Sequence, residues 1–312
     1  MKKFVSEVFA RNIQEWIPIP RCRQGEKIFH YTDLRALKGM VTEQSFWVTK
    51  SDFLNDKYEF RYAYKVIRKV CEKMIPGEEN RHLVISGLKH QLEMIDNVME
   101  NRVLSGWYVL SFSRQRDSLL LWTEFGKSQG YCLEFEYSSL ADSLESGIML
   151  DGYVIYEKEQ QKKLIEATIN HLLGEKGRSS LKEKLLSEGK KVTEEELYPF
   201  LMEFAVCSFV YSMFFKKECF REEKEYRFVF WAFHEEEEGS GMALTPMHFR
   251  EKNQTLIPYI EVRYQQEGES PICAITVGPK NNSDLAVRGI QYFLRNEKID
   301  IPVYESKIPL RY

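Results

Sequence analysis

The chain has 312 residues, enough to bury a large core in one or two domains. Its hydrophobic fraction of 43% and aromatic fraction of 13% are typical of an ordered globular protein and exclude an intrinsically disordered chain. The formal net charge of -3 excludes a general electrostatic attraction to nucleic acid, so an anionic partner would need a local basic patch.

The sequence indicates neither a targeting segment nor a metal centre. Met1-Lys2-Lys3 is not followed by an apolar stretch long enough for a signal sequence, and no run approaches the roughly 18 apolar residues of a membrane span. The six cysteines and six histidines are scattered, without Cys-x-x-Cys or zinc-ligand spacing. We therefore expect a cytoplasmic protein with free thiols, no membrane contact and no metal.

The first half of the chain mixes short strands with helices. We expect strands at 28–31, 45–49 and 107–113, and helices over the first twenty residues, at 34–43, from 59 to about 102, and at 118–125. Thr32 or Asp33 is a suitable cap for the helix at 34–43. The segment Phe53-Leu54-Asn55-Asp56 is typical of a tight turn.

The second half has longer helices and then a run of strands. We expect strands at 130–135, 152–156, 225–233, 257–262, 272–279 and 301–304, helices at 157–216 and 283–295, and a hairpin or exposed loop at 235–241. Strands and helices do not alternate regularly. We therefore expect a single α+β domain over residues 1–312, with a mixed, mainly antiparallel sheet and helical insertions at about 59–105 and 157–216.

The charged segment Glu223-Lys224-Glu225-Tyr226-Arg227 comes directly before an apolar run. On a strand, Glu223 and Glu225 project from one face, and Lys224 and Tyr226 project from the other. Two carboxylates on a rigid face can stabilise a developing positive charge or accept a proton. The alternative is a solvated strand edge, in which Lys224 and Arg227 balance the acids.

Other polar or aromatic side chains lie on or near expected strands. His30 is either a packed histidine or a neutral imidazole that donates a hydrogen bond to a ligand hydroxyl, and Tyr31 beside it is a candidate core residue. Ser111 and Ser113 share one strand face, either as a strand end before a turn or as ligand contacts. Trp122 is either a packing residue or a cover for a flat aromatic ligand.

These blocks resemble those of an uncharacterised bacterial family, for which no activity is established. Its blocks stand here as His30-Tyr31-Thr32, Phe53-Leu54-Asn55-Asp56, Ser111-Phe112-Ser113 with Leu121-Trp122, and Glu223-Lys224-Glu225-Tyr226-Arg227. The resemblance covers roughly residues 28 to 300. The helical region 157–216 is its least familiar part.

More distantly, the order of His30, Ser111-Phe112-Ser113 and Glu223-Lys224-Glu225 resembles that of ADP-ribosyltransferases that use NAD. This resemblance implies an ADP-ribosyltransferase-like sheet and an oxocarbenium ion formed when the bond between nicotinamide and ribose breaks. Glu225 would stabilise that cation and bind a ribose hydroxyl, at a gain on the order of 3 kcal/mol. Glu223 would orient or deprotonate the acceptor.

The same resemblance implies the residues that bind the NAD substrate. His30 would fix the second ribose, with Thr32 in the same block, and Ser111 or Ser113 would support the nicotinamide side and Glu225. Trp122 or Tyr31 would stack on the nicotinamide. Because the elements combine features of two subclasses, the resemblance does not imply a particular acceptor.

We therefore expect an NAD-consuming ADP-ribosyltransferase or NAD glycohydrolase that needs no metal. By family analogy it would be a bacterial toxin or phage-defence effector, with a protein or nucleic-acid acceptor and an antitoxin or regulatory partner. One alternative is a non-catalytic module that binds a protein or a nucleotide. Another is a nucleic-acid-processing protein that uses the basic pairs Lys162-Lys163 and Lys216-Lys217.

Overall fold

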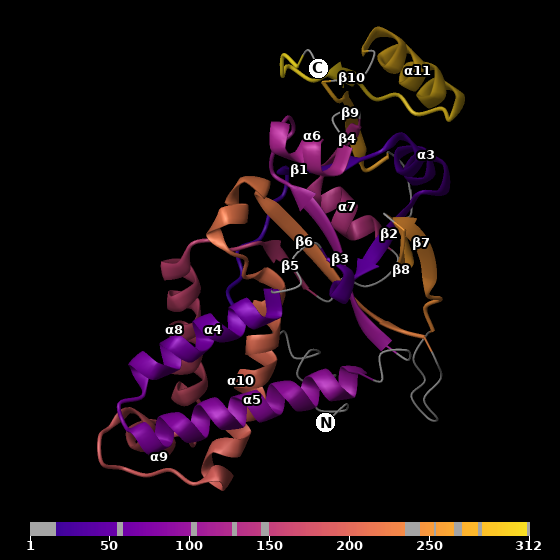
Figure 1. Cartoon of the computed structure of the whole chain (residues 1–312). Helices are drawn as coiled ribbons and strands as arrows, with labels where there is room; N and C mark the ends of the chain where they lie inside the picture. The colour runs from indigo at the N-terminus through magenta and orange to yellow at the C-terminus, as the bar shows by residue number, and fades with distance from the viewer. Residues whose placement is uncertain are drawn as a thin grey trace. The chain divides into compact units, whose positions relative to one another are not determined.

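The computed structural model describes residues 17–54, 59–100, 105–126, 130–144, 150–234, 244–252, 254–264, 270–279 and 283–310. The chain forms two compact units, each built from separate segments (Figure 1). The helical unit comprises Met1–Pro20, Asn55–Gly106 and Val154–Phe220, and the sheet unit comprises Arg21–Leu54, Trp107–Tyr153 and Arg221–Tyr312. The expectation of one domain with two helical insertions stays a prediction.

The helical unit is built around one apolar helix, α10. Its helices are α4 (Glu59–Met74), α5 (Glu78–Glu100), α8 (Lys158–Gly174), α9 (Ser179–Leu186) and α10 (Glu194–Phe214). Helices α4, α5 and α8 each pack against α10 (Figure 1). Phe204 and the ten residues after it are all buried, so α10 contributes core side chains on every side of its axis.

By length and composition, α10 is also apolar enough to cross a membrane. In the structure, 83% of its apolar window is buried inside the protein. A helix that is apolar all round and covered by neighbouring helices fits the centre of a helical core.

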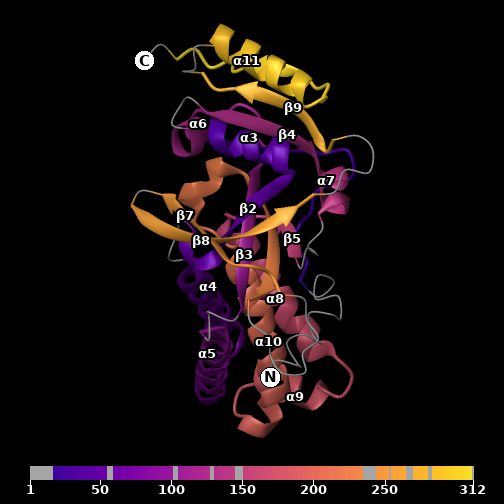
Figure 2. The same ribbon diagram turned by 90° about the vertical axis from the view of Figure 1, so that its right-hand side faces the viewer.

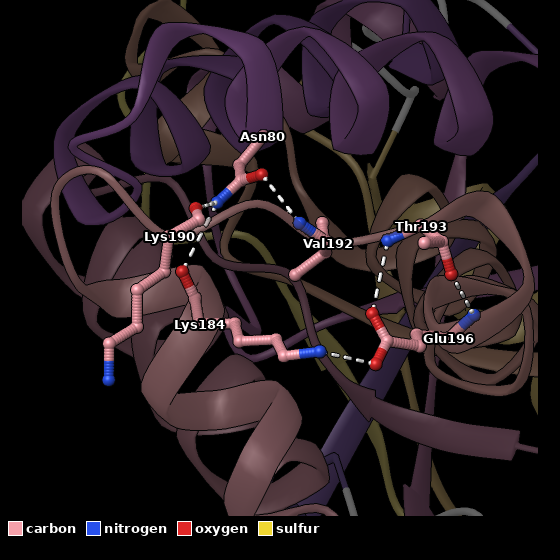
Figure 3. Close-up of polar contacts among 6 residues, drawn as sticks. All are labelled: Asn80, Lys184, Lys190, Val192, Thr193 and Glu196. Atoms are coloured by element: carbon pink, nitrogen blue, oxygen red, sulfur yellow. Dashed lines mark hydrogen bonds and ion pairs between the residues drawn. The ribbon is translucent and has the colours of Figure 1, made fainter.

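Asn80, near the start of α5, anchors the loop between α9 and α10 (Figure 3). Its Nδ2 donates hydrogen bonds to the carbonyl oxygens of Lys184, at 3.1 Å, and Lys190, at 2.7 Å. Its Oδ1 accepts from the amide of Val192 at 3.1 Å. The Asn80 side chain is buried, so it supplies partners that water cannot supply to these backbone groups.

Helix α10 begins with a capping box, also drawn in Figure 3. Thr193 Oγ1 accepts from the amide of Glu196 at 3.3 Å, and Glu196 Oε2 accepts from the amide of Thr193 at 3.1 Å. Lys184 Nζ lies 2.6 Å from Glu196 Oε1. These contacts fix where the chain turns into α10.

The sheet unit contains a mixed, mainly antiparallel sheet. Its strands are β1 (Lys27–Thr32), β2 (Ser45–Lys50), β3 (Ser105–Ser113), β4 (Tyr131–Glu136), β5 (Leu150–Tyr153), β6 (Glu225–Phe233), β7 (His248–Lys252), β8 (Thr255–Arg263), β9 (Ile272–Val277) and β10 (Val303–Glu305). The order is β10-β9-β4-β1-β3-β2-β8-β7, and β6 pairs with both β3 and β5. The pairing of β10 with β9 is parallel, and the other described registers are antiparallel. The predicted α+β class is confirmed.

Helices cover the sheet and connect its strands. They are α3 (Leu34–Glu43), α6 (Leu119–Gly126), α7 (Tyr137–Ser143) and α11 (Ser283–Asn296), with the short 3-10 helices η1 (Ser51–Phe53) and η2 (Glu218–Glu223). Figure 2 shows α11 beside β9 at one end of the sheet. Ile290 and Leu294 of α11 contribute to the main core of this unit.

Strand β3 is the branch point of the sheet because it has three neighbours, β1, β2 and β6. A strand has two edges, so two of these neighbours share one edge. Strand β1 pairs at Ser113, and β2 pairs at Tyr108 and Val109. The Ser111-Phe112-Ser113 block therefore lies at the end of β3 that pairs with β1.

Two apolar clusters flank this part of the sheet. Phe112 of β3 belongs to the larger cluster, with Phe46 and Phe228 among its members. Tyr31 and Trp122 belong to the smaller cluster. Because successive side chains alternate along a strand, Ser111 and Ser113 point away from the larger cluster.

Candidate functional site

Glu225, the first residue of β6, has its carboxylate held by two other residues. Arg227 Nε lies 2.8 Å from Oε1 and Arg227 Nη2 lies 2.9 Å from Oε2. Ser111 Oγ donates to Oε1 at 2.6 Å. Glu225 and Arg227 are two residues apart on one strand and therefore share a face, and both are buried. The bidentate pair fixes the plane of the carboxylate.

His30 joins the same group of contacts through the backbone of Ser111. Its Nδ1 lies 3.0 Å from the Ser111 carbonyl oxygen, and its ring packs 5.3 Å from the ring of Phe112 and 5.8 Å from that of Phe46. The pairing of Phe29 with Ser113 places His30 opposite Phe112, on the face away from the Ser111 hydroxyl. The blocks of His30, Ser111 and Glu225 thus meet at Ser111, with the His30 ring on the other side of β3.

Burial lowers the pKa of His30 from 6.5 to about 4, so the ring is neutral at pH 7. A carbonyl oxygen only accepts hydrogen bonds, so Nδ1 carries the proton and Nε2 is left as an acceptor. The expectation that His30 donates to a ligand hydroxyl is therefore corrected: its only ring N–H is used by the Ser111 carbonyl, and Nε2 can act only as an acceptor.

Glu223 lies outside the strand that begins at Glu225. It is the last residue of η2, and Lys224 adopts a left-handed conformation with φ of 44°. The strand alternation therefore does not extend back to Glu223, and the expected shared face of the two acids is wrong. Ser113 Oγ donates to the backbone carbonyl of Glu223 at 2.7 Å. Ser113 thus anchors the chain just before β6.

Tyr31, Thr32 and Trp122 are core residues in the structure. Trp122 is 0% exposed, and its Nε1 donates to Asp117 Oδ1 at 2.7 Å. Tyr31 packs edge-on against Trp122 at 4.7 Å and donates its hydroxyl to the Gln115 carbonyl at 2.9 Å. Thr32 is buried too. The expected stacking of Trp122 or Tyr31 on a nicotinamide is corrected, because the surrounding core covers both rings.

Sequence reasoning missed the role of Arg227. It treated this arginine as one of two cations balancing a solvated edge, whereas its side chain is 1% exposed and binds both oxygens of Glu225. The pairing could have been predicted from the sequence, because Glu225 and Arg227 are two residues apart and side chains at that spacing on one strand share a face. The same rule was applied to Glu223 instead.

Within the described parts of the chain, no three or more His, Cys, Asp or Glu side chains are grouped to hold a metal ion. The groups that face one another around Ser111 are instead a serine hydroxyl, a carboxylate and a guanidinium. Such a set can orient a hydroxyl-bearing ligand by hydrogen bonds and place a fixed negative charge beside it.

Part of the chain is similar to a known protein family. Residues 121–228 match a family described as "Protein of unknown function (DUF2971)". The matched segment contains Leu121-Trp122 and the block from Glu223 to Arg227, and it excludes His30 and Ser111. This match supports the expected resemblance to an uncharacterised family. No curated protein and no solved structure matches the chain.

Proposed function

We propose that this protein is an NAD-consuming enzyme, an ADP-ribosyltransferase or NAD glycohydrolase, with Glu225 as its catalytic carboxylate. The observation that carries the proposal is the hydrogen bond from Ser111 Oγ to Glu225 Oε1, which joins two of the blocks. Side chains from two separate blocks thereby meet on one face of β3, in line with the distant resemblance of those blocks to ADP-ribosyltransferases, whereas the His30 ring lies on the opposite face.

The chemistry at Glu225 follows from its fixed geometry. Breaking the bond between nicotinamide and ribose leaves a positive charge on the ribose, and a carboxylate already oriented by Arg227 and Ser111 needs little rearrangement to stabilise it. The His30 ring lies on the opposite face of the sheet from the Ser111 hydroxyl, so its role in this site is limited to its contact with the Ser111 backbone carbonyl. Glu223 lies just before β6, and we retain the proposal that its carboxylate orients the acceptor.

The wider biology is part of the same proposal. A protein or nucleic acid would accept the ADP-ribose, or water in the glycohydrolase case, in the bacterial cytoplasm. A role as a toxin or phage-defence effector, held in check by an antitoxin or regulatory partner, rests on analogy with the resembling enzymes.

A second candidate function, a non-catalytic binding module, is favoured by one specific observation. Both oxygens of Glu225 are bonded to the buried Arg227, as expected for an ion pair that stabilises the strand. In that case the Glu225–Arg227 pair supports a binding surface and no NAD is cleaved.

Nicotinamide release from NAD distinguishes the two functions. We expect the wild type to release nicotinamide and Glu225→Gln to be slower by about 100-fold or more, the loss seen when one stabilising group is removed from an ionic transition state. Glu222→Gln is the matched control, because the side chain of Glu222 is 62% exposed. It should behave as the wild type.

The assay is run with and without a bacterial lysate as a source of acceptor, and the fold of each variant is checked by circular dichroism. Release that is equal in wild type and folded Glu225→Gln would remove Glu225 from the mechanism. A folded wild type that releases no nicotinamide under either condition would favour the binding module.

A further inference from the structure

A second arginine of the sheet unit, Arg250, is held in place without an ion pair to any described carboxylate, although the charge of Asp33 acts on it. It lies in the middle of β7, is half-buried, and donates from Nη2 to Thr49 Oγ1 at 2.7 Å. Within the described residues no carboxylate lies within ion-pair distance of its guanidinium. This contrasts with Arg227, which is bonded to both oxygens of Glu225.

The hydrogen-bonding capacity of Arg250 is only partly used. Its Nε is buried and has no partner among the described residues. Nη1 also makes no hydrogen bond to a described residue, but unlike Nε it is not buried, so this end of the guanidinium reaches solvent. A charged group that has lost water and gained no ion pair costs free energy, and burial accordingly lowers the pKa of Arg250 although the charge of Asp33 acts to raise it. An anion at Nη1 would offset that cost.

Thr49 can bind the same anion. Its hydroxyl oxygen accepts from Arg250, which leaves the hydroxyl proton to donate elsewhere. Thr49 pairs with Val109 of β3, so its side chain lies on the same sheet face as that of Val109. Arg250 and Thr49 together present a guanidinium end and a hydroxyl donor side by side.

A cluster of three aromatic rings lies beside the Arg250 guanidinium. The Arg250 guanidinium lies 5.9 Å from the centre of the Tyr259 ring. Trp47 stacks on Tyr259 at 4.8 Å, and the exposed His248 packs 5.5 Å from the same ring. Flat rings beside a cation are the setting in which proteins bind the base and the phosphate of a nucleotide.

We infer that Arg250 and Thr49 form a binding site for a phosphate group, placed so that a base attached to that phosphate contacts the Trp47 and His248 rings, which pack on the buried Tyr259 ring. One phosphate oxygen accepts from Arg250 Nη1 and another accepts from the Thr49 hydroxyl. The shared chemistry is the phosphate group, which either inorganic phosphate or a nucleotide can supply. The site does not rest on NAD cleavage at Glu225, and it stands if that proposed function fails.

Isothermal titration calorimetry at low ionic strength tests the site with orthophosphate, AMP and adenosine. We expect the wild type to bind orthophosphate and AMP and Arg250→Gln to bind each at least tenfold more weakly. Lys252→Gln is the matched control, because Lys252 lies two residues along the same edge strand, is exposed and carries the same charge. It should bind within about twofold of the wild type, since an exposed charge contributes little.

The three ligands distinguish the sources of phosphate. AMP that binds tighter than orthophosphate, with adenosine weaker than both, would identify a nucleotide site, and equal binding of the two phosphates would identify a site for free phosphate. Absence of wild-type binding at millimolar concentrations, or equal binding by wild type, Arg250→Gln and Lys252→Gln, would overturn the inference.

A second measurement uses the wild type alone and does not depend on how well Arg250→Gln folds. The Nε–H resonance of Arg250 is identified by its loss in Arg250→Lys and followed by NMR during titration with AMP. A saturable shift supports the site. A resonance that does not move while AMP is added would overturn it.

Discussion

At Glu225 the same side chain serves stability and, in the proposed mechanism, chemistry. Removing one member of a buried ion pair costs about 3–5 kcal/mol, because the other charge stays buried without a partner. The electrostatic gain expected for catalysis is of similar size, about 3 kcal/mol. Both activity and stability therefore have to be measured for any Glu225 variant, because a loss of catalysis and a loss of folded protein would each lower the observed activity.

His30 gives a prediction at the level of one residue. Its pKa is lowered from 6.5 to about 4 by burial among the rings of Phe46 and Phe112. Between pH 6.5 and 4 the unfolded chain therefore takes up a proton at His30 that the folded chain does not. Stability linked to His30 is present above pH 6.5 and is lost as the pH falls through this window, by up to about 3 kcal/mol.

Urea unfolding of wild type and His30→Gln at several pH values between 7 and 4 measures this effect. The charge of Arg250 also lowers the pKa of His30, and it stays positive across this pH range, so it does not change the shape of the curve. The free energy of unfolding of the variant should fall less steeply with decreasing pH than that of the wild type. Parallel curves would show that His30 titrates alike in the folded and unfolded chains.

At the scale of elements, hydrophobic pattern and capping were enough to locate most helices and strands. The helix at 34–43 and the strand at 225–233 are confirmed with the predicted bounds as α3 and β6. The α3 cap is Asp33, whose side chain accepts from the Ala36 amide. The predicted helix over the first residues and the predicted loop at 235–241 lie outside the described residues, apart from 17–20.

The elements that were missed lack those signals. Strand β7 (His248–Lys252) is mostly exposed and carries three basic residues, so no apolar alternation indicates it. Helix α7 (Tyr137–Ser143) is short and is capped by the side chain of Glu136, which is not among the preferred capping residues. Both elements are formed by tertiary packing rather than by a local pattern.

The contact between Asn80 and the loop before α10 gives a prediction for that element. Asn80→Ala leaves the Val192 amide and the carbonyls of Lys184 and Lys190 without their side-chain partner. Because the site is buried, the free energy of unfolding should fall by about 3 kcal/mol. Urea denaturation followed by circular dichroism at 222 nm measures this loss.

Lys190→Gln is the control for that experiment. It removes an ion pair between Lys190 and Glu183 whose side chains are 47% and 65% exposed, and it leaves the Lys190 carbonyl bonded to Asn80. It should cost less than about 1 kcal/mol. Equal losses in the two variants would show that the Asn80 contacts contribute little beyond a surface ion pair.

At the scale of the whole molecule, the order of the blocks did not determine which side chains meet. Ser111 and Glu225 are 114 positions apart, and their contact depends on the pairing of β3 with β6. The sequence indicated the three blocks but not the left-handed residue at Lys224 that takes Glu223 off the strand. It also did not reveal that Trp122 is enclosed by the core. Long-range pairing and backbone handedness decide such details, and residue type alone does not.

The last prediction concerns how the two units unfold. The chain passes between the helical unit and the sheet unit five times, since six segments alternate along it, so neither unit is a continuous stretch. Trp47, Trp107, Trp122 and Trp231 belong to the sheet unit, whereas the longest helices belong to the helical unit. In a Trp16→Phe background, tryptophan fluorescence therefore reports on the sheet unit and circular dichroism at 222 nm reports mainly on the helical unit.

With this pair of probes, Asn80→Ala tests whether the chain is one cooperative domain. Since neither unit can form from a single segment, we expect one transition: the substitution in the helical unit should shift the urea midpoints of both signals equally. A shift of the circular dichroism midpoint with an unchanged fluorescence midpoint would mean that the helical unit unfolds by itself. The expected single domain would then have to be replaced by two domains that share one interrupted chain.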